Sequence, residues 1–448
     1  MEWWANPYNY MFREAAKLVY RLLTQTSNSM LKDIWREWRF PIEFSLLLGL
    51  AFFLPLREAP KNIFWLAYVL TWLVNRISTR DFGGKWSGWD SLVVAWVASG
   101  YLAAAFGEIQ RGNGNEWYAV NDLVRYASLF LCVRRSRFTQ EQWAALVFVL
   151  IGSGLIALAE AMWRWRVAGI KNALELASVG QVNHSAIYLT TLQGLATAAI
   201  LARWRSMSKA ASVFYVIAAS ALYFGVFTTG SRAAIAALLV LIVLMTIVLW
   251  KPGGFHSRRV LLLVFSFMTL FGLWAGQSAV EKQIEKSGTV GFLNLRDHIW
   301  KRGLEAWRVN TLFGMGMDNY SQISDERLAQ WQQARGEPVR AMSKASKAPH
   351  AHSIYINTLV ERGLVGFSAL LLILLAWAAT LSLGRPRLGD SPIKSLLWGG
   401  AFSGWFVTVF VGLFNTTLHH EHAILPLLLF GAWLACSREQ TGVGLHTR

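Results

Sequence analysis

Two histidines stand directly before an apolar run that is long enough to cross a membrane. The pair is His350 and His352, and only Glu361 and Arg362 interrupt the run that follows. An imidazole group has an unperturbed pKa of about 6.5, so it can accept a proton from a hydroxyl group near neutral pH. At the water end of a membrane helix, such a base reaches molecules whose tails lie in the lipid. His352 is therefore a candidate general base.

The spacing of this pair does not favour a metal site. Residues two apart point away from each other in a helix, whereas a helical zinc site uses histidines four apart. The sequence has no HExxH pattern, and its two cysteines, Cys132 and Cys436, lie at the ends of separate apolar blocks. We therefore predict no metal and no cofactor. The structural alternative for His352 is a histidine that caps a helix or lies at the membrane interface.

A second candidate lies in residues 228–232, which read Thr-Thr-Gly-Ser-Arg and connect two apolar blocks. The connector is so short that Arg232 must lie at or just inside the membrane interface, where a guanidinium is costly unless it meets an anion. Its paired N–H donors match phosphate oxygens, and Gly230 would let the backbone approach closely. The alternative is an arginine that anchors the end of a helix by snorkelling.

A third candidate, Arg296, opens a helix-like stretch in a long polar segment. Trp300 and Trp307 lie on the same helical face, which predicts that Arg296 projects from a face docked on the membrane helices. The alternative is a surface charge that pairs with Asp297 or with water. The Gly-x-Gly of residues 314–316 is a weak indication, because a dinucleotide site needs a third glycine and a flanking strand.

Three further groups of polar residues lie near the ends of apolar blocks. Residues 415–422 hold three histidines beside a carboxylate, and their crowding predicts an exposed, hydrated turn rather than a metal site. Asp122 and Arg125 lie three apart inside a predicted span, which favours a mutual ion pair. Three side chains open another block and could line a sugar pocket: Gln181, Asn183 and His184.

The composition predicts an all-α membrane protein with about twelve spanning helices. Hydrophobic residues make up 54% of the 448 positions and charged residues only 15%. The apolar residues come in blocks of roughly 20, the length that crosses a bilayer as a helix, and they lack the alternation of membrane strands. The predicted spans are residues 41–56, 62–75, 89–106, 118–133, 142–162, 184–202, 211–229, 232–250, 259–277, 353–383, 395–414 and 420–437.

Positive charge in the connectors predicts the orientation. One set of connectors holds fifteen Lys and Arg residues and the opposite set, without its one long loop, holds seven, so the first set and both termini are expected to be cytoplasmic. The net charge of +17 lies mostly in these connectors, with no basic run of the kind that binds nucleic acid. The expected organisation is an interfacial amphipathic segment (1–38), nine spans (39–277), a partly helical extracytoplasmic loop (278–351), three spans (352–437) and a cytoplasmic tail (438–448).

Two arginines depart from this charge rule. Arg164 and Arg166 alternate with Trp163 and Trp165 at an extracytoplasmic end of a predicted span. They either bind the phosphates of an anionic lipid or anchor the helix.

The candidate residues occur in the order of a known family. Ser231 and Arg232 open a mid-chain helix, an Arg-x-x-x-Trp helix starts at Arg296, and His352-Ser353 precedes an apolar run that contains Gly-x-x-Gly at residues 363–366. In order and in membrane side, these elements resemble the O-antigen ligase and polymerase superfamily, over roughly residues 180–385. Members often have Asn where this chain has Ser353. The sequence looks most like the O-antigen ligases of Gram-negative inner membranes, which resemble the GT-C class of transferases.

The resemblance implies an enzyme that moves a polysaccharide from undecaprenyl diphosphate to a sugar hydroxyl of lipid A-core, at the periplasmic face and without a metal. Carried over by position, Arg232 and Arg296 bind the diphosphate with Ser231 beside them, and His352 acts on the acceptor hydroxyl. His350, Arg164 and Arg166 are further expected substrate contacts, and substitution of His350 is expected to matter less. The alternatives are an O-antigen polymerase, a protein O-oligosaccharyltransferase with the same donor, and a transporter or flippase of an anionic lipid.

Overall fold

The chain folds into helices and connecting turns, and the residues that the structure describes contain no strand. The computed structural model describes residues 29–111, 114–204, 206–249, 296–340, 342–343, 347–387, 389–418 and 421–442. The helices are α2 (Ser29–Phe53), α3 (Glu58–Thr79), α4 (Gly88–Phe106), α5 (Asn115–Arg135), α6 (Gln140–Arg166), α7 (Val182–Arg203), α8 (Lys209–Thr229), α9 (Arg232–Val248), α12 (Arg296–Trp307), η1 (Tyr320–Gln322), α13 (Asp325–Ala334), α14 (Ile354–Leu383), α15 (Pro392–Gly412) and α16 (Glu421–Gly442).

Each predicted span that falls on described residues coincides with a helix. Among the described helices, α4, α6, α7, α8, α14 and α15 are long and apolar enough to cross a membrane. The shorter α9 and the stretch 422–438 of α16 are also apolar. The chain is therefore a polytopic membrane protein. The number of twelve spans stays a prediction, and the expected segment 1–28 and the expected span 259–277 lie outside the described residues.

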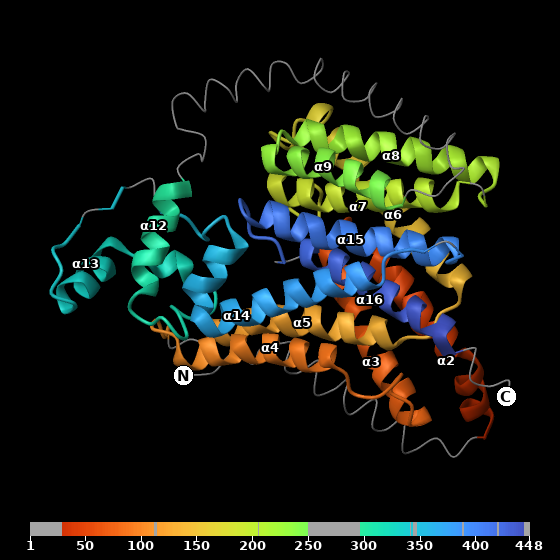
Figure 1. Ribbon diagram of the computed structural model, residues 1–448, viewed down its shortest axis with the longest axis horizontal. Helices are drawn as coiled ribbons and strands as arrows, with labels where there is room; N and C mark the ends of the chain where they lie inside the picture. The colour runs from red at the N-terminus through yellow and green to blue at the C-terminus, as the bar shows by residue number, and fades with distance from the viewer. Residues whose placement is uncertain are drawn as a thin grey trace.

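Helix α7 lies at the centre of the bundle. Its residues from His184 to Ile200 are all buried, as expected for a helix that other helices surround. It packs against α8, α9 and α15, and α15 packs in turn against α16. Figure 1 shows α12 and α13 together beyond one end of the bundle, where α14 enters it. The two helical stretches predicted in the polar segment are thus present as α12 and α13.

Helix α14 is broken near its N-terminal end. Gly363 has φ 60° and ψ −162° inside the helix, a conformation that only glycine adopts readily. A side chain there would collide with the Leu312 carbonyl oxygen, since a Cβ atom would lie 2.2 Å from it. The amides beyond the break bond outside the helix: Leu364 N donates to Thr311 O at 2.9 Å, and Val365 N donates to Leu312 O at 3.2 Å.

The Gly-x-Gly turn of residues 314–316 fills this break. Gly314 and Gly316 both have positive φ, and the amide of Met315 between them donates to Val360 O of α14 at 2.8 Å. A Cβ atom on Gly107, just beyond α4, would lie 2.4 Å from the Cα of Gly316. The glycines therefore allow the turn to pack closely between α4 and α14. This packing accounts for both glycines without a nucleotide-binding site.

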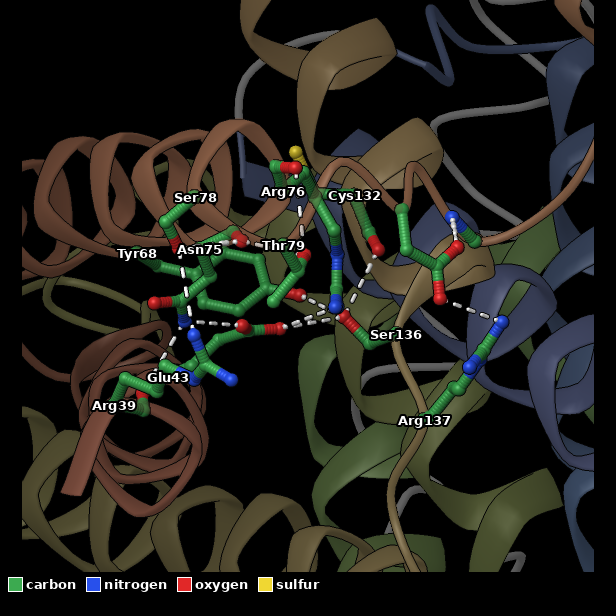
Figure 2. Close-up of polar contacts among 12 residues, drawn as sticks. Arg39, Glu43, Tyr68, Asn75, Arg76, Ser78, Thr79, Cys132, Ser136 and Arg137 are labelled. Atoms are coloured by element: carbon green, nitrogen blue, oxygen red, sulfur yellow. Dashed lines mark hydrogen bonds and ion pairs between the residues drawn. The ribbon is translucent and has the colours of Figure 1, made fainter. Parts of the chain in front are cut away.

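A buried carboxylate joins three helices at the end of the bundle that we predict to be cytoplasmic. Figure 2 shows Glu43 of α2, which accepts hydrogen bonds from Asn75 Nδ2 at 2.8 Å and Arg76 Nη2 at 3.2 Å of α3. It also accepts one from Ser136 Oγ at 3.0 Å, directly after α5. Glu43 is fully buried, so these donors replace its water shell.

Replacing this carboxylate should destabilise the bundle. In Glu43→Gln, the amide NH₂ would face groups that now donate to the carboxylate, and the charge opposite Arg76 would be lost. We expect a loss of about 1–3 kcal/mol in the free energy of unfolding, measured as a lower Tm in detergent. Glu58→Gln, at an exposed position in the first turn of α3, is the matched control and should leave Tm unchanged. Equal Tm values for the two variants would contradict the assigned role of Glu43.

Candidate active site

His352 lies in a strained turn just before α14. Its φ is 49°, in the left-handed region that costs a non-glycine residue about 1–3 kcal/mol. The N-cap of α14 is Ser353, whose side chain accepts from Ile356 N at 3.5 Å, so His352 is not the helix cap. The expectation that the two histidines point apart is wrong, because they precede the helix rather than lie in it. The rings of His350 and His352 contact each other, with centroids 4.3 Å apart.

Side chains from two helices fix the peptide that leads into His352. Trp300 Nε1 of α12 donates to the Ala351 carbonyl oxygen at 2.8 Å. The Ala351 amide donates to Asn357 Oδ1 of α14 at 2.9 Å, and Asn357 Nδ2 donates to Glu361 Oε2 at 2.9 Å. Both hydrogen-bonding groups of the Ala351 backbone are therefore engaged, and this arrangement stabilises the strained turn.

The two candidate arginines begin two different helices. Arg232 is the first residue of α9, after Ser231 as N-cap and Gly230 in the left-handed conformation. Arg296 is the first residue of α12, and its Nε is buried without a hydrogen-bond partner among the described residues. Partial burial lowers the pKa of Arg296, and the positive charge of Arg232 lowers it further. Two guanidinium groups therefore lie near one another in a partly desolvated place, an arrangement that an anion would stabilise.

The positive charge of Arg296 also acts on His352. Burial lowers its pKa to about 4, and His350, Arg296 and His184 each contribute in the same direction. Its Nδ1 is buried and has no hydrogen-bond partner among the residues that the structure describes. The imidazole is therefore neutral, and able to accept a proton, through the whole physiological pH range.

A cavity of about 510 Å³ lies beside His350. His350 lines it, together with residues of α5, α7 and α14 and of the turn before α16. Its polar lining residues include Tyr118, Asp122, Gln181, His184, Asp318, Asn357, Glu361 and Thr416. A smaller cavity of about 70 Å³ shares Asn357, Glu361 and Thr416 with it and reaches Arg362. The two cavities therefore meet at the broken end of α14.

The family described as O-Antigen ligase matches residues 214–371, about a third of the chain. This segment contains Arg232, Arg296 and His352 together with the turn and the helix break that surround them. This match supports membership in the O-antigen ligase/polymerase superfamily. The chain is also similar to an uncharacterized protein of Haemophilus influenzae, with 26% identity over 147 residues, which are 30% of this chain and 35% of that protein. Membership in the superfamily supports a function of the ligase or polymerase type.

Not every predicted site residue lies with the arginine and histidine groups. The contacts of Arg164 and Arg166 that the structure describes are local: Arg164 lies 4.0 Å from Glu160, and Arg166 lies over the ring of Trp165 at 3.8 Å. None of these contacts joins them to Arg232 or His352 within the described part of the chain. Their binding of substrate stays a prediction.

One prediction about the last connector is wrong. Residues 415–418 and His422 are buried rather than exposed and hydrated. The amide of Ile354 donates to Asn415 O at 3.1 Å, so this connector packs on the start of α14 and is removed from water. The ring of His422 lies on that of His184, with centroids 4.4 Å apart. His419 and His420 lie outside the described residues.

Other sequence-based interpretations are confirmed. Arg125 Nη2 donates to Asp122 Oδ1 at 2.9 Å, the predicted ion pair. The alternative in which Arg296 pairs with Asp297 is not seen among the described ion pairs, since Asp297 lies 3.8 Å from His298 instead. Gln181 and His184 line the large cavity, as expected for a pocket, whereas Asn183 is not among its lining residues. The two cysteines are free and buried.

Sequence reasoning missed the supporting residues of α14. Glu361 and Arg362 are both buried, and Asn357 links Glu361 to the turn that carries His352. A pair of charges inside a membrane-length apolar run was visible in the sequence, and such residues usually mark a functional site. Its partners were not visible, because Tyr320 N, which donates to Glu361 Oε1 at 3.3 Å, comes from a distant turn.

Proposed function

We propose that this protein is an O-antigen ligase. It transfers a polysaccharide from undecaprenyl diphosphate to a sugar hydroxyl of lipid A-core, at the periplasmic face of a Gram-negative inner membrane, with both termini cytoplasmic. The family match carries the proposal, because residues 214–371 contain Arg232, Arg296 and His352. The positive charge of Arg232 lowers the pKa of Arg296, and that of Arg296 lowers the pKa of His352, which supports it. A bound diphosphate would pair with the guanidinium groups of Arg232 and Arg296 and would lie beside His352, the general base.

The arginine pair fits a diphosphate leaving group. When the bond between the anomeric carbon and the phosphate oxygen breaks, that oxygen keeps the electron pair and gains negative charge. Two guanidinium groups in a partly desolvated site stabilise this charge, and the N-terminus of α9, capped by Ser231, adds to the positive potential. In this proposal the arginines supply the charge stabilisation that a metal ion provides in other transferases.

His352 fits the role of general base. Its neutral imidazole accepts the proton of the acceptor hydroxyl as the oxygen forms a bond with the anomeric carbon and the diphosphate leaves. Direct displacement of this kind inverts the anomeric centre. A double displacement needs a carboxylate nucleophile, but the nearby Glu361 already accepts hydrogen bonds at both oxygens, from Tyr320 N and Asn357 Nδ2. We therefore prefer inversion.

The alternatives differ in what accumulates when the protein is lost. Loss of a ligase leaves lipid-linked polymer in the membrane and no polymer on lipopolysaccharide, whereas loss of a polymerase stops chain extension. A flippase moves the donor across proteoliposomes and forms no product. The deciding experiment supplies purified protein in proteoliposomes with undecaprenyl-diphosphate-linked glycan and lipid A-core. Absence of transferred product would overturn the proposed function, and loss of activity with a chelator would overturn its metal independence.

Two tryptophans of α12 test whether the turn positions His352. Trp300→Phe keeps the ring but removes the donor to Ala351 O, so we expect transfer to slow about fivefold, the effect of one neutral hydrogen bond. Trp307→Phe is the matched control, because the Trp307 Nε1 donates at 3.0 Å to Thr311 O and not to the turn that carries His352. The measurement is kcat at saturating donor and acceptor. Equal slowing in both variants would contradict a positioning role for Trp300.

A further inference from the structure

The lining of the large cavity lacks the cationic side chains that mark the arginine pair. Its described residues include three acidic side chains, those of Asp122, Asp318 and Glu361, and no Lys or Arg. The cations that pair with the first two, Arg125 and Arg111, are not among the lining residues. Such a lining offers phosphate groups no cationic partner. The cavity is therefore not an extension of the site for the diphosphate.

The same lining suits a ligand with many uncharged hydroxyl groups. Carboxylate and amide oxygens accept hydrogen bonds from hydroxyls, and the amide NH₂ groups of Asn115, Gln181 and Asn357 can donate to them. Tyr118, which is 56% exposed, adds an aromatic face for the apolar side of a sugar ring. A volume of about 510 Å³ lies within the range of small-ligand pockets, so a short saccharide fits and a long lipid tail does not.

The histidine pair joins this cavity to the arginines. His350 lines the cavity and contacts His352, and His352 in turn lies in the field of Arg296. A saccharide in the cavity would thus present its hydroxyl groups to His350, within a lining that contains neither Arg232 nor Arg296. In a direct displacement the incoming hydroxyl and the leaving diphosphate must lie on different sides of the reacting carbon. The cavity is placed for the incoming group.

We propose that this cavity binds the uncharged sugar end of the acceptor, with Tyr118 and Gln181 as contacts on two walls and His350 as the contact nearest the base. The inference rests on the proposed function, because it assigns the acceptor of that reaction to a defined place. It also gives His350 a role in acceptor binding that is separate from the proton transfer at His352.

The kinetic test compares residues that line the cavity with near neighbours in the sequence that do not. Tyr118→Ala and Gln181→Ala each remove a lining side chain, and we expect each to raise the KM for lipid A-core about tenfold, with the KM for the lipid-linked donor unchanged. Trp117→Ala and Asn183→Ala are the matched controls, because neither residue lines the cavity. Both constants should stay at the wild-type value in the controls.

A binding measurement separates this inference from the reaction itself. Tyr118→Cys places a thiol in the cavity, while the two native cysteines are buried. A membrane-impermeant maleimide should modify this thiol several-fold more slowly in the presence of delipidated core oligosaccharide, and the thiol of Trp117→Cys should show no such protection. Unchanged modification of Tyr118→Cys, or a rise only in the donor KM, would overturn the inference. Protection without any transfer by the wild-type protein would retain the saccharide site and overturn the proposed function.

Discussion

His352→Ala is expected to abolish glycan transfer while the donor still binds. A positioned general base contributes about 10²–10⁴ to the rate, and the positive charge of Arg296 acts on His352. His350 contacts His352 but lines the cavity, so His350→Ala should have a smaller effect on kcat. His298→Ala, on the exposed surface of α12, is the control and should transfer normally. Turnover at the wild-type rate by His352→Ala would refute the assignment of the base.

The pH profile tests the same residue without a substitution. Because burial and the neighbouring positive charges lower the pKa of His352 to about 4, its neutral form persists well below pH 6.5. The plot of kcat/KM, which reports groups of the free enzyme, should therefore fall only near pH 4. A bound diphosphate stabilises the imidazolium, so the fall in kcat should lie at higher pH than the fall in kcat/KM. A fall in kcat/KM near pH 6.5 would contradict the described surroundings of His352.

The second large effect is expected for the arginine pair. Arg232→Ala and Arg296→Ala should each lower the rate of transfer about 10²-fold or more, because each removes a charged donor from the leaving group in a partly desolvated site. The double variant should lose less than the product of the two single losses, since the two side chains act on one anion. Arg→Lys variants keep the charge but lose the paired donors, so they should recover only part of the rate.

Two controls define the outcome for the arginines. Arg308→Ala removes an exposed arginine that pairs with Glu305 and Glu337, and it should not alter transfer. Tm in detergent shows whether a slow variant is still folded. If Arg296→Ala is slow only because the protein is unfolded, or if either variant transfers at the wild-type rate, the diphosphate site is wrongly placed.

Sequence patterns predicted the helices well because each membrane span carries its own pattern. Every apolar block that falls on described residues is a helix, and the helix-like stretch expected around Arg296 to Val309 is present as α12. The three principal site residues were named from residue type, position at a block end and resemblance. These properties are local, so they can be recognised along a chain without knowledge of its folding.

The contacts between distant segments could not be predicted in the same way. The hydration of residues 415–418 was misjudged because their burial depends on packing against the start of α14. The contact between His350 and His352 depends on the left-handed turn, and helical spacing does not apply to it. The cavity unites α5, α7 and α14, and its lining residues show no common pattern along the sequence.

The break at Gly363 also determines when the site can form during synthesis. The turn of residues 311–316 leaves the ribosome before α14, yet its backbone partners are Val360, Leu364 and Val365 of that helix. Until α14 is inserted, these amides and carbonyls remain hydrated outside the bilayer. The nascent chain therefore carries an incomplete site through most of its translation, and a chain truncated before α14 would accumulate as an inserted but inactive intermediate.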